Sequence, residues 1–349
     1  MTGTMKAVVK TSRAPGAELQ TVKIPELKPT DVLVKVKATS ICGTDVHIYG
    51  WDPWSQGRIK NIPQVLGHEF AGEVVEVGSQ VHHIKPGDFI SAETHIPCRQ
   101  CIQCLTDQMH ICSNLSILGV DIDGCFAEYA AIPEVVCWKN SPDIPPEFAC
   151  VQEPLGNAVY ATLVEDVAGK TVAIIGEGPT GLFAAGVARA SGATEIFVLG
   201  RNRFRLDISK KMGADHIIFI DEMNPVDYIM EKTHGIGVDV VLEMAGAQQA
   251  IDDGFKIVRK GGRFSAFGIP GGNIRIDYAN GIIFKGVTIY GINGRLMFDT
   301  WFKVRNLLSS RRLDIAPVIT HKLPLESFEE GFKLLTEGDR KTGKIVLIP

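Results

Sequence analysis

Two kinds of hydrophobic pattern divide the chain. In the first part, short runs such as residues 5–9 and 31–38 are rich in β-branched residues and bounded by Pro and Gly, which predicts half-buried antiparallel strands. Residues 65–78 predict a further strand pair with a Gly-containing turn. From Thr171 onward, continuous apolar runs alternate with helical segments, which is typical of a parallel sheet buried on both faces.

These patterns predict an α/β protein with a doubly wound parallel-sheet domain and a mostly β, barrel-like domain. A length of 349 residues is enough for about two domains of typical size. A helical pattern at 301–310 and strand patterns at 319–322 and at the C-terminus suggest that the tail returns to the β domain. We therefore expect residues 1–157 and 296–349 to form the β domain, with a small lobe at 95–115, and residues 158–295 to form the parallel-sheet domain.

The composition is that of an ordinary globular protein, with 22% charged residues, 45% hydrophobic residues and a net charge of -4. No basic block suggests binding to nucleic acid or to an anionic membrane surface. The longest apolar runs are too short to span a bilayer, and residues 1–10 lack the apolar core of a signal peptide. We therefore expect a cytoplasmic protein.

Four of the eight cysteines are clustered with the spacing C-x2-C-x2-C-x7-C, at Cys98, Cys101, Cys104 and Cys112. In a large cytosolic chain such a cluster indicates a metal site rather than disulfides. Four thiolates close a tetrahedral zinc shell, so this site would stabilise the fold and carry no chemistry. An iron-sulfur cluster is compatible with the spacing alone, but a second metal-ligand stretch earlier in the chain favours zinc.

That second stretch covers residues 38–69 and includes C-G-T-D-V-H and G-H-E. Cys42, His68 and Glu69 offer a thiolate, an imidazole and a carboxylate, a ligand mix that zinc accepts. With an open position the metal would polarise an alcohol or carbonyl oxygen. Thr44 could take the hydroxyl proton and His47 could pass it toward solvent. Each residue alone would most often be structural, whereas their order is far more specific.

A glycine-rich turn lies between the strand pattern at 171–175 and an Ala-rich helical pattern. It reads G-E-G-P-T-G, and between a strand and a helix this spacing is the dinucleotide fingerprint. The glycines permit a tight turn and close approach of the pyrophosphate to the helix N-terminus. The predicted contact residues of this turn are Gly176, Gly178, Pro179, Thr180 and Gly181.

The end of the next strand predicts which dinucleotide is bound. NAD-binding domains carry an acid about twenty residues past the glycines, where it binds the ribose 2′-hydroxyl. Here the strand ends in Gly200, followed by Arg201 and Arg203, with no carboxylate. Gly200 leaves room and the arginines could neutralise a 2′-phosphate. This pattern favours NADP over NAD, although the two arginines could equally be solvated surface charges.

The motifs together resemble the zinc-dependent medium-chain alcohol dehydrogenase family, in which the β domain is GroES-like and the nucleotide domain is a Rossmann fold. The resemblance spans nearly the full length and is closest to the branch of threonine dehydrogenases, through S-I-C-G-T-D-V-H-I-Y-G-W-D-P-W, E-T-H-I-P-C, L-G-V-D-I-D-G, Q-E-P-L-G-N-A-V and G-R-L-M-F-D-T-W. It implies oxidation of a secondary alcohol with two zinc ions per chain and a nicotinamide cofactor. Family members are commonly dimers or tetramers, so it also implies a homo-oligomer.

The resemblance implies roles for further residues. Glu153 matches a later acid of the family's metal site, where it could bind zinc directly or exchange with water. His95 could contact the substrate's polar groups or instead orient the metal loop, and Arg295 could bind a substrate carboxylate or a cofactor phosphate. Further positions match residues that line the family's cofactor cleft, namely Arg205, Phe267, Gly268, Ile269, Ile292 and Asn293.

Two other functions fit the same motifs. Threonine dehydrogenases of this type use NAD and carry an acid where this chain has Gly200, so a sister enzyme acting on a polyol or amino-cyclitol with NADP is the close alternative. A zinc-stabilised nucleotide-binding protein without dehydrogenase activity is an alternative of another class. The intact set of Cys42, Thr44, His47, His68 and Glu153 argues against the latter.

Overall fold

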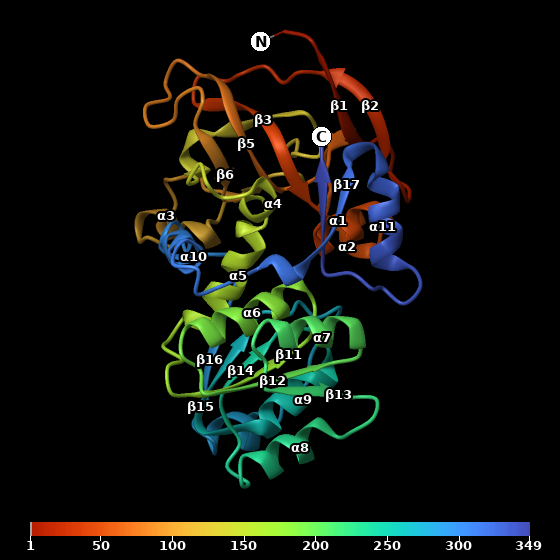
Figure 1. Cartoon of the computed structure of the whole chain (residues 1–349). Coiled ribbons are helices and arrows are strands. Elements are labelled where there is room, and N and C mark those ends of the chain that lie inside the picture. Colours follow the sequence, from red (N-terminus) through yellow and green to blue (C-terminus); the bar gives the residue numbers. More distant parts are fainter. Residues whose placement is uncertain (1) are drawn as a thin grey trace. The chain divides into compact units, whose positions relative to one another are not determined.

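The computed structural model describes residues 2–349, and the chain divides into two compact units (Figure 1). The first unit contains the chain up to Glu153 together with Ile319–Pro349, and the second is Pro154–Val318. The return to the first unit therefore comes at residue 319, whereas the sequence pattern places it at residue 296. The intervening segment groups with the second unit because Thr300 and Leu313 lie against helices of that unit.

The first unit is mainly β. Its strands are β1 (Thr4–Lys10), β2 (Glu18–Lys23), β3 (Asp31–Ser40), β4 (Gln64–Val65), β5 (Glu69–Val77), β6 (Phe89–Ala92), β7 (His95–Ile96), β8 (Ser116–Ile117), β9 (Tyr129–Pro133), β10 (Cys137–Lys139), β17 (Ile319–Pro324) and β18 (Lys344–Ile348). Its helices are α1 (Gly43–Gly50), α2 (Pro53–Arg58), α3 (Ile102–Leu105), α4 (Pro146–Ala149) and α11 (Phe328–Thr336). Helix α5 (Gln152–Leu163) begins at the boundary between the units.

A seven-stranded sheet organises this unit, with the order β10-β6-β5-β3-β18-β17 and with β9 paired to β3. The C-terminal strand β18 therefore lies beside β3, so Val346 faces Ser40 in the antiparallel register. The predicted strand pair at 65–78 is wrong, because β4 pairs with β1 in a separate three-stranded sheet while β5 pairs with β3 and β6. Gly67, at a φ of 89°, lies in the turn that redirects the chain between them.

The second unit holds a six-stranded parallel sheet in the order β13-β12-β11-β14-β15-β16. Its strands are β11 (Thr171–Ile175), β12 (Glu195–Gly200), β13 (His216–Phe219), β14 (Val238–Glu243), β15 (Val258–Ala266) and β16 (Thr288–Gly291). Its helices after α5 are α6 (Pro179–Ala190), α7 (Arg203–Lys211), α8 (Pro225–Lys232), α9 (Gln248–Ile257) and α10 (Asp299–Ser309). The order reverses at β11, as in a doubly wound dinucleotide-binding sheet, and the predicted α/β class is confirmed.

Burial explains why the sequence folds this way. Strands β11 and β12 are buried almost throughout, which their continuous apolar runs require. In Figure 1, α6 and α7 cover one face of this sheet and α8 and α9 the other.

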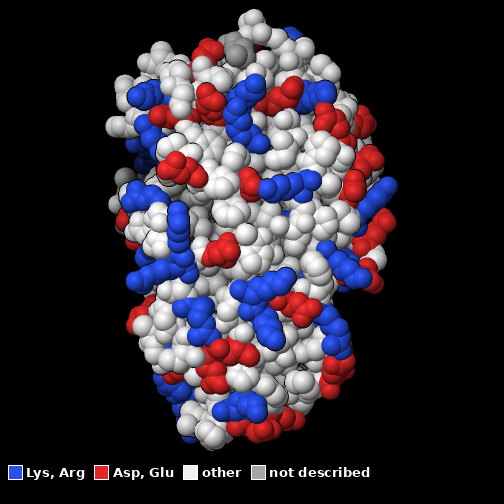
Figure 2. Space-filling model, in the orientation of Figure 1, with Lys and Arg blue, Asp and Glu red and all other residues white. Residues whose placement is uncertain are grey.

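Among residues 2–349, no helix is both long enough and apolar enough to cross a bilayer. On the face drawn in Figure 2, basic and acidic side chains are interspersed.

Candidate functional site

The first candidate site joins the N-terminus of α1 to the start of β5. Cys42 is the N-cap residue of α1, and its backbone N–H donates to Asp45 Oδ2 at 2.8 Å. His68 and Glu69 lie at the start of β5. One ligand atom of each of Cys42, His68 and Glu69 lies within 4.8 Å of the others. The structure thus brings together the three residues that the sequence predicts as a metal-binding set.

The surroundings of these residues favour a bound cation. His68 is 5% exposed and Glu69 is fully buried, and among residues 2–349 neither His68 Nδ1 nor Glu69 Oε1 has a hydrogen-bond partner. Burial alone would lower the pKa of His68, but the negative groups of Asp45 and Cys42 raise it well above its usual value. His68 Nδ1 lies 3.6 Å from Asp45 Oδ1, so a carboxylate supports the imidazole, and the clustered thiol, imidazole and carboxylate fit zinc.

Two partners of Glu69 could not be read from the motif. Glu69 Oε2 accepts hydrogen bonds from Ser40 Oγ and from Lys344 Nζ, which reaches it from the C-terminal strand. Lys344 also donates to the carbonyl of Ile41 at 3.1 Å. Burial would lower the pKa of Lys344, but the charges of Glu69 and Cys42 raise it. The protein thus fixes one carboxylate oxygen of Glu69, and such supporting contacts are typical of metal ligands.

The predicted proton-relay residues lie on the same helix. Thr44 Oγ1 is 3.9 Å from Cys42 Sγ, and His47 follows one turn later with its side chain exposed. His47 Nδ1 lies 2.5 Å from Asp52 Oδ2. Burial would raise the pKa of Asp52, but hydrogen bonds from Ser55 and His47 lower it below its usual value. Asp52, which the sequence reading missed, therefore presents a charged acceptor to His47 Nδ1, leaving Nε2 to accept a proton.

Glu153 and His95 lie in the first unit but outside the group of three ligands. Glu153 is 6% exposed, and its Oε1 accepts a hydrogen bond from Thr94 Oγ1 at 3.1 Å. His95 is half-buried in β7, and its backbone N–H donates to Glu93 Oε1 at 3.2 Å. Zinc contact for Glu153 and substrate contact for His95 stay predictions.

The second metal site is the cysteine lobe. Cys98, Cys101, Cys104 and Cys112 offer sulfur atoms that all lie within 4.8 Å of one another. The sulfur of Cys101 is 3.5 Å from that of Cys104 and 3.7 Å from that of Cys112. Tetrahedral zinc with bonds of about 2.3 Å would separate its sulfurs by about 3.8 Å. Backbone N–H groups, led by that of Gln100, lower the pKa of Cys98 to about 6, whereas desolvation and the neighbouring thiols raise the pKa of Cys104 to about 12, as expected where several thiols titrate in one small volume.

The glycine-rich turn of the second unit has the form of a phosphate-binding loop. Gly176 follows β11 with a φ of 113°, and Gly178 is the N-cap of α6. A Cβ added to Gly181 would lie 2.0 Å from the carbonyl oxygen of Gly176, so only glycine permits this close packing. Pro179 occupies the first turn of the helix and Thr180 follows it. The free N–H groups of this helix start fit the pyrophosphate of a dinucleotide.

The residues predicted for the cofactor cleft lie at the carboxyl ends of the parallel strands, where such folds bind nucleotides. Phe267 and Gly268 follow β15, and their backbone N–H groups each donate to the carbonyl of Glu243 at 3.0 Å. Ile269 is 88% exposed. Ile292 and Asn293 follow β16, while Gly200, Arg201, Arg203 and Arg205 lie at the end of β12 and the start of α7.

Arg295 lies inside the second unit. It is 1% exposed, its Nη1 donates to Asn157 Oδ1 at 2.8 Å, and its side chain packs against Gly156. A role for Arg295 in binding a carboxylate or phosphate stays a prediction.

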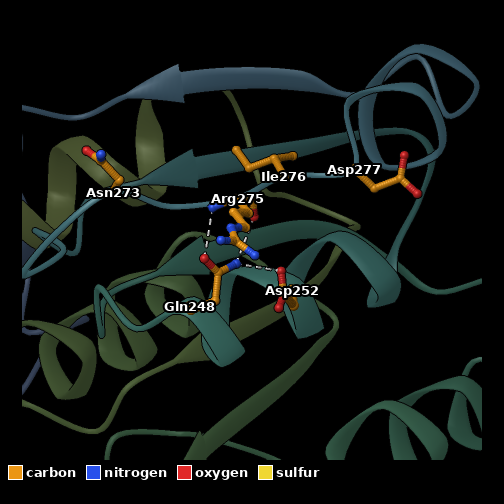
Figure 3. Close-up of a pocket in the computed structure, with 6 residues that line it drawn as sticks. All are labelled: Gln248, Asp252, Asn273, Arg275, Ile276 and Asp277. Carbon is orange, nitrogen blue, oxygen red and sulfur yellow. Dashed lines mark hydrogen bonds between the residues drawn. The ribbon is translucent and has the colours of Figure 1, made fainter.

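An open hollow of about 520 Å³ lies elsewhere in the second unit, between α9 and the loop after β15 (Figure 3). Gln248 bridges its two walls, donating to Asp252 Oδ1 and to the carbonyl of Arg275. None of the residues that line it belongs to the predicted sites.

Comparison with protein families matches both units. Residues 28–144 match the alcohol dehydrogenase GroES-like domain, and residues 179–310 match the zinc-binding dehydrogenase domain. The chain is 48% identical to L-threonine 3-dehydrogenase of Bacillus licheniformis, over 100% of both chains. It is 49% identical to L-threonine 3-dehydrogenase of Pyrococcus horikoshii, over 100% of this chain and 99% of that one.

Solved structures of similar proteins share the fold throughout. A zinc-binding dehydrogenase from Sinorhizobium meliloti bound to NADP, described as putative, has a TM-score of 0.91 at 29% identity and covers 99% of this chain and 100% of its own. The 2R,3R-butanediol dehydrogenase of Bacillus subtilis has a TM-score of 0.89 at 28% identity and covers 99% of both chains.

Proposed function

The chain belongs to the zinc-binding medium-chain alcohol dehydrogenase family and is a zinc-dependent dehydrogenase acting on CH–OH groups, and we propose that its substrate is L-threonine, oxidised at the 3-hydroxyl. The observation that carries this proposal is the identity of 48–49% with several L-threonine 3-dehydrogenases over the full length. Full-length relatives that share one substrate make that substrate the first choice, whereas the fold alone would not.

The proposed site assigns Cys42, His68 and Glu69 as zinc ligands, with Glu153 as a nearby or exchanging ligand. Zinc held by these residues would supply Lewis-acid polarisation of the alcohol oxygen, and a bound nicotinamide would supply the hydride acceptor. Side chains of the protein carry out the proton transfer. Thr44 accepts the hydroxyl proton of the substrate and His47 passes it to solvent.

Asp52 supports this relay by position. Its carboxylate lies 2.5 Å from His47 Nδ1 and also accepts from the backbone N–H of Ser55 at 2.9 Å. Because Ser55 holds the carboxylate in place, His47 keeps one tautomer, with Nε2 free to accept a proton from Thr44. We expect His95 and Arg295 to contact the polar groups of the substrate. His95 would do so from the first unit, where it precedes the cysteine lobe.

The test is an initial-rate assay of the zinc-loaded protein, following reduced-nicotinamide absorbance. L-threonine and a panel of polyols and amino-cyclitols are each run with NAD and with NADP. We expect the highest kcat/KM with L-threonine. Faster oxidation of a polyol or amino-cyclitol would refute the threonine assignment and keep the zinc chemistry.

A matched pair of cysteine variants tests the metal assignment. Cys42→Ser removes a proposed ligand, and we expect it to abolish turnover and release one zinc per chain. Cys137→Ser is the control, because Cys137 lies outside both ligand groups and its thiol donates to the carbonyl of Pro133 at 3.5 Å. Equal zinc content and activity in the two variants would refute the role of Cys42.

The NADP preference predicted from Gly200 and its arginines stays a prediction. We further expect a cytoplasmic homo-oligomer, either a dimer or a tetramer. Light scattering of the purified protein measures the oligomeric state.

A further inference from the structure

A carboxylate lies at the end of β12, although the sequence has none there. Glu177, the second residue of the glycine-rich turn, accepts hydrogen bonds at Oε1 from the backbone N–H groups of Arg201 at 3.1 Å and Asn202 at 2.9 Å. A Cβ added to Gly200 would lie 2.2 Å from Glu177 Oε2. The Glu177 carboxylate therefore fills the space that a side chain at residue 200 would take.

This position matters because of where a dinucleotide binds in such a sheet. The end of the second strand meets the adenosine ribose, and a carboxylate there accepts the 2′-hydroxyl of NAD. Here β11 is the first strand of the domain and β12 the second. The acid that is absent from position 200 is thus supplied in space by a residue 23 positions earlier in the chain.

The two arginines that would neutralise a 2′-phosphate already face acids. Arg201 Nε lies 3.4 Å from Asp221 Oδ1, and the guanidinium of Arg203 pairs with Glu222. With Glu177, three carboxylates lie at this strand end, beside the three arginines Arg201, Arg203 and Arg205. The backbone N–H groups that could bind a phosphate oxygen donate to Glu177 instead. A 2′-phosphate would therefore meet like charge and occupied donors.

We propose that Glu177 determines the dinucleotide specificity of this enzyme. Its carboxylate accepts the 2′-hydroxyl of NAD and excludes the 2′-phosphate of NADP, so NAD is the preferred cofactor. This reverses the preference predicted from Gly200, Arg201 and Arg203. The inference rests on the proposed function only in requiring that a nicotinamide dinucleotide binds.

Direct binding tests this inference without any alcohol substrate. The zinc-loaded protein is titrated with NADH and with NADPH, and nicotinamide fluorescence gives each Kd. We expect wild type to bind NADH at least about tenfold more tightly, and Glu177→Gln to reduce that ratio by about tenfold, mainly through tighter NADPH binding. Glutamine keeps an oxygen for the two N–H donors, so the loop retains its hydrogen bonds. Glu195→Gln is the control, because it removes a carboxylate from the opposite end of β12 and should leave the ratio unchanged.

A second variant moves the acid within the site. Gly200→Asp alone would clash with Glu177, whereas Glu177→Ala combined with Gly200→Asp places the carboxylate on the strand end itself. We expect this double variant to recover the NADH preference that Glu177→Ala alone loses.

Three outcomes would overturn the inference: tighter binding of NADPH by wild type, a ratio in Glu177→Gln within about twofold of wild type, or a double variant that behaves like Glu177→Ala. Binding of neither dinucleotide would instead refute the proposed function. A normal thermal unfolding midpoint in each variant assigns the changes to recognition rather than to misfolding.

Discussion

The buried ion pair between Lys344 and Glu69 provides a sharp test of how the C-terminal strand supports the metal site. Lys344 is 3% exposed and Glu69 is fully buried, and the pair joins β18 to the start of β5. We expect Lys344→Met to destabilise the first unit strongly. Methionine has a similar length but no charge, so Glu69 would keep Ser40 as a partner and lose its counter-charge.

The expected magnitude follows from the burial of both charges. Removing one partner of a buried pair costs about 3–5 kcal/mol because the other charge is left uncompensated, whereas an exposed pair contributes about 0–1 kcal/mol. In a unit of this size, about 2–4 °C of thermal midpoint corresponds to each kcal/mol. Lys344→Met should therefore lower the midpoint by about 6–20 °C.

Lys322→Met is the matched control, because Lys322 lies on the neighbouring strand β17 and pairs with Glu147 at the surface. A cation bound by Cys42, His68 and Glu69 would offset part of the orphaned charge. The comparison is therefore made by calorimetry in a Cys42→Ser background, with the cysteine lobe still holding its metal. The reasoning is refuted if Lys344→Met costs no more than Lys322→Met.

Three further predictions concern other parts of the chain. Burial would raise the pKa of Asp239, but hydrogen bonds from Thr171 help to lower it below its usual value. The stability that this carboxylate contributes is therefore present above its unfolded pKa and lost as the pH falls through its folded pKa, and urea midpoints should fall less on acidification in Asp239→Asn than in wild type. Cys112→Ser should release one zinc per chain and lower the thermal midpoint, both measurable on the purified protein. Gly67→Ala should cost about 2–6 kcal/mol in urea unfolding, because the φ is 89° and the added Cβ would lie 2.1 Å from the Phe126 ring.

Each of these predictions has a contrary result. If the urea midpoints of wild type and Asp239→Asn fell equally on acidification, the Asp239 carboxylate would not contribute to the pH dependence of stability. Unchanged zinc content in Cys112→Ser would show that the lobe needs only three of its sulfurs. Gly57→Ala in α2 is the control for Gly67, since nothing lies within 4 Å of its added Cβ. Equal unfolding energies for these two glycine variants would contradict the predicted clash.

Much of the fold could be predicted because its signals are local. The strand patterns at 5–9 and 31–38 became β1 and β3, and the helical pattern at 301–310 became α10 with nearly the same bounds. The periodicity of hydrophobic residues indicates whether one or both faces of an element are buried, and burial of those apolar side chains stabilises the element in the fold. The pattern at 65–78 failed because strand partners are chosen by the whole sheet and not by the neighbouring residues.

The sequence by itself determined which chemical groups are present and which of them act together over short distances. The spacing of the four lobe cysteines and that of the glycines between a strand and a helix are short-range features, whereas Cys42 lies 26 positions before His68 and the two are linked by the order of their motifs. Their chemistry follows from residue type and spacing, so no tertiary information was needed to predict two metal sites and a dinucleotide site.

Only the tertiary structure decided which groups surround those sites. Lys344 meets Glu69 across 275 positions because β18 pairs with β3, and no local pattern encodes that pairing. Glu177 reaches the end of β12 because the first and second strands of the sheet are neighbours and Gly200 leaves the space open. The sequence has no acid at position 200, yet the structure has a carboxylate beside that position. The two differ because electrostatic interactions depend on distance in space and not on separation along the chain.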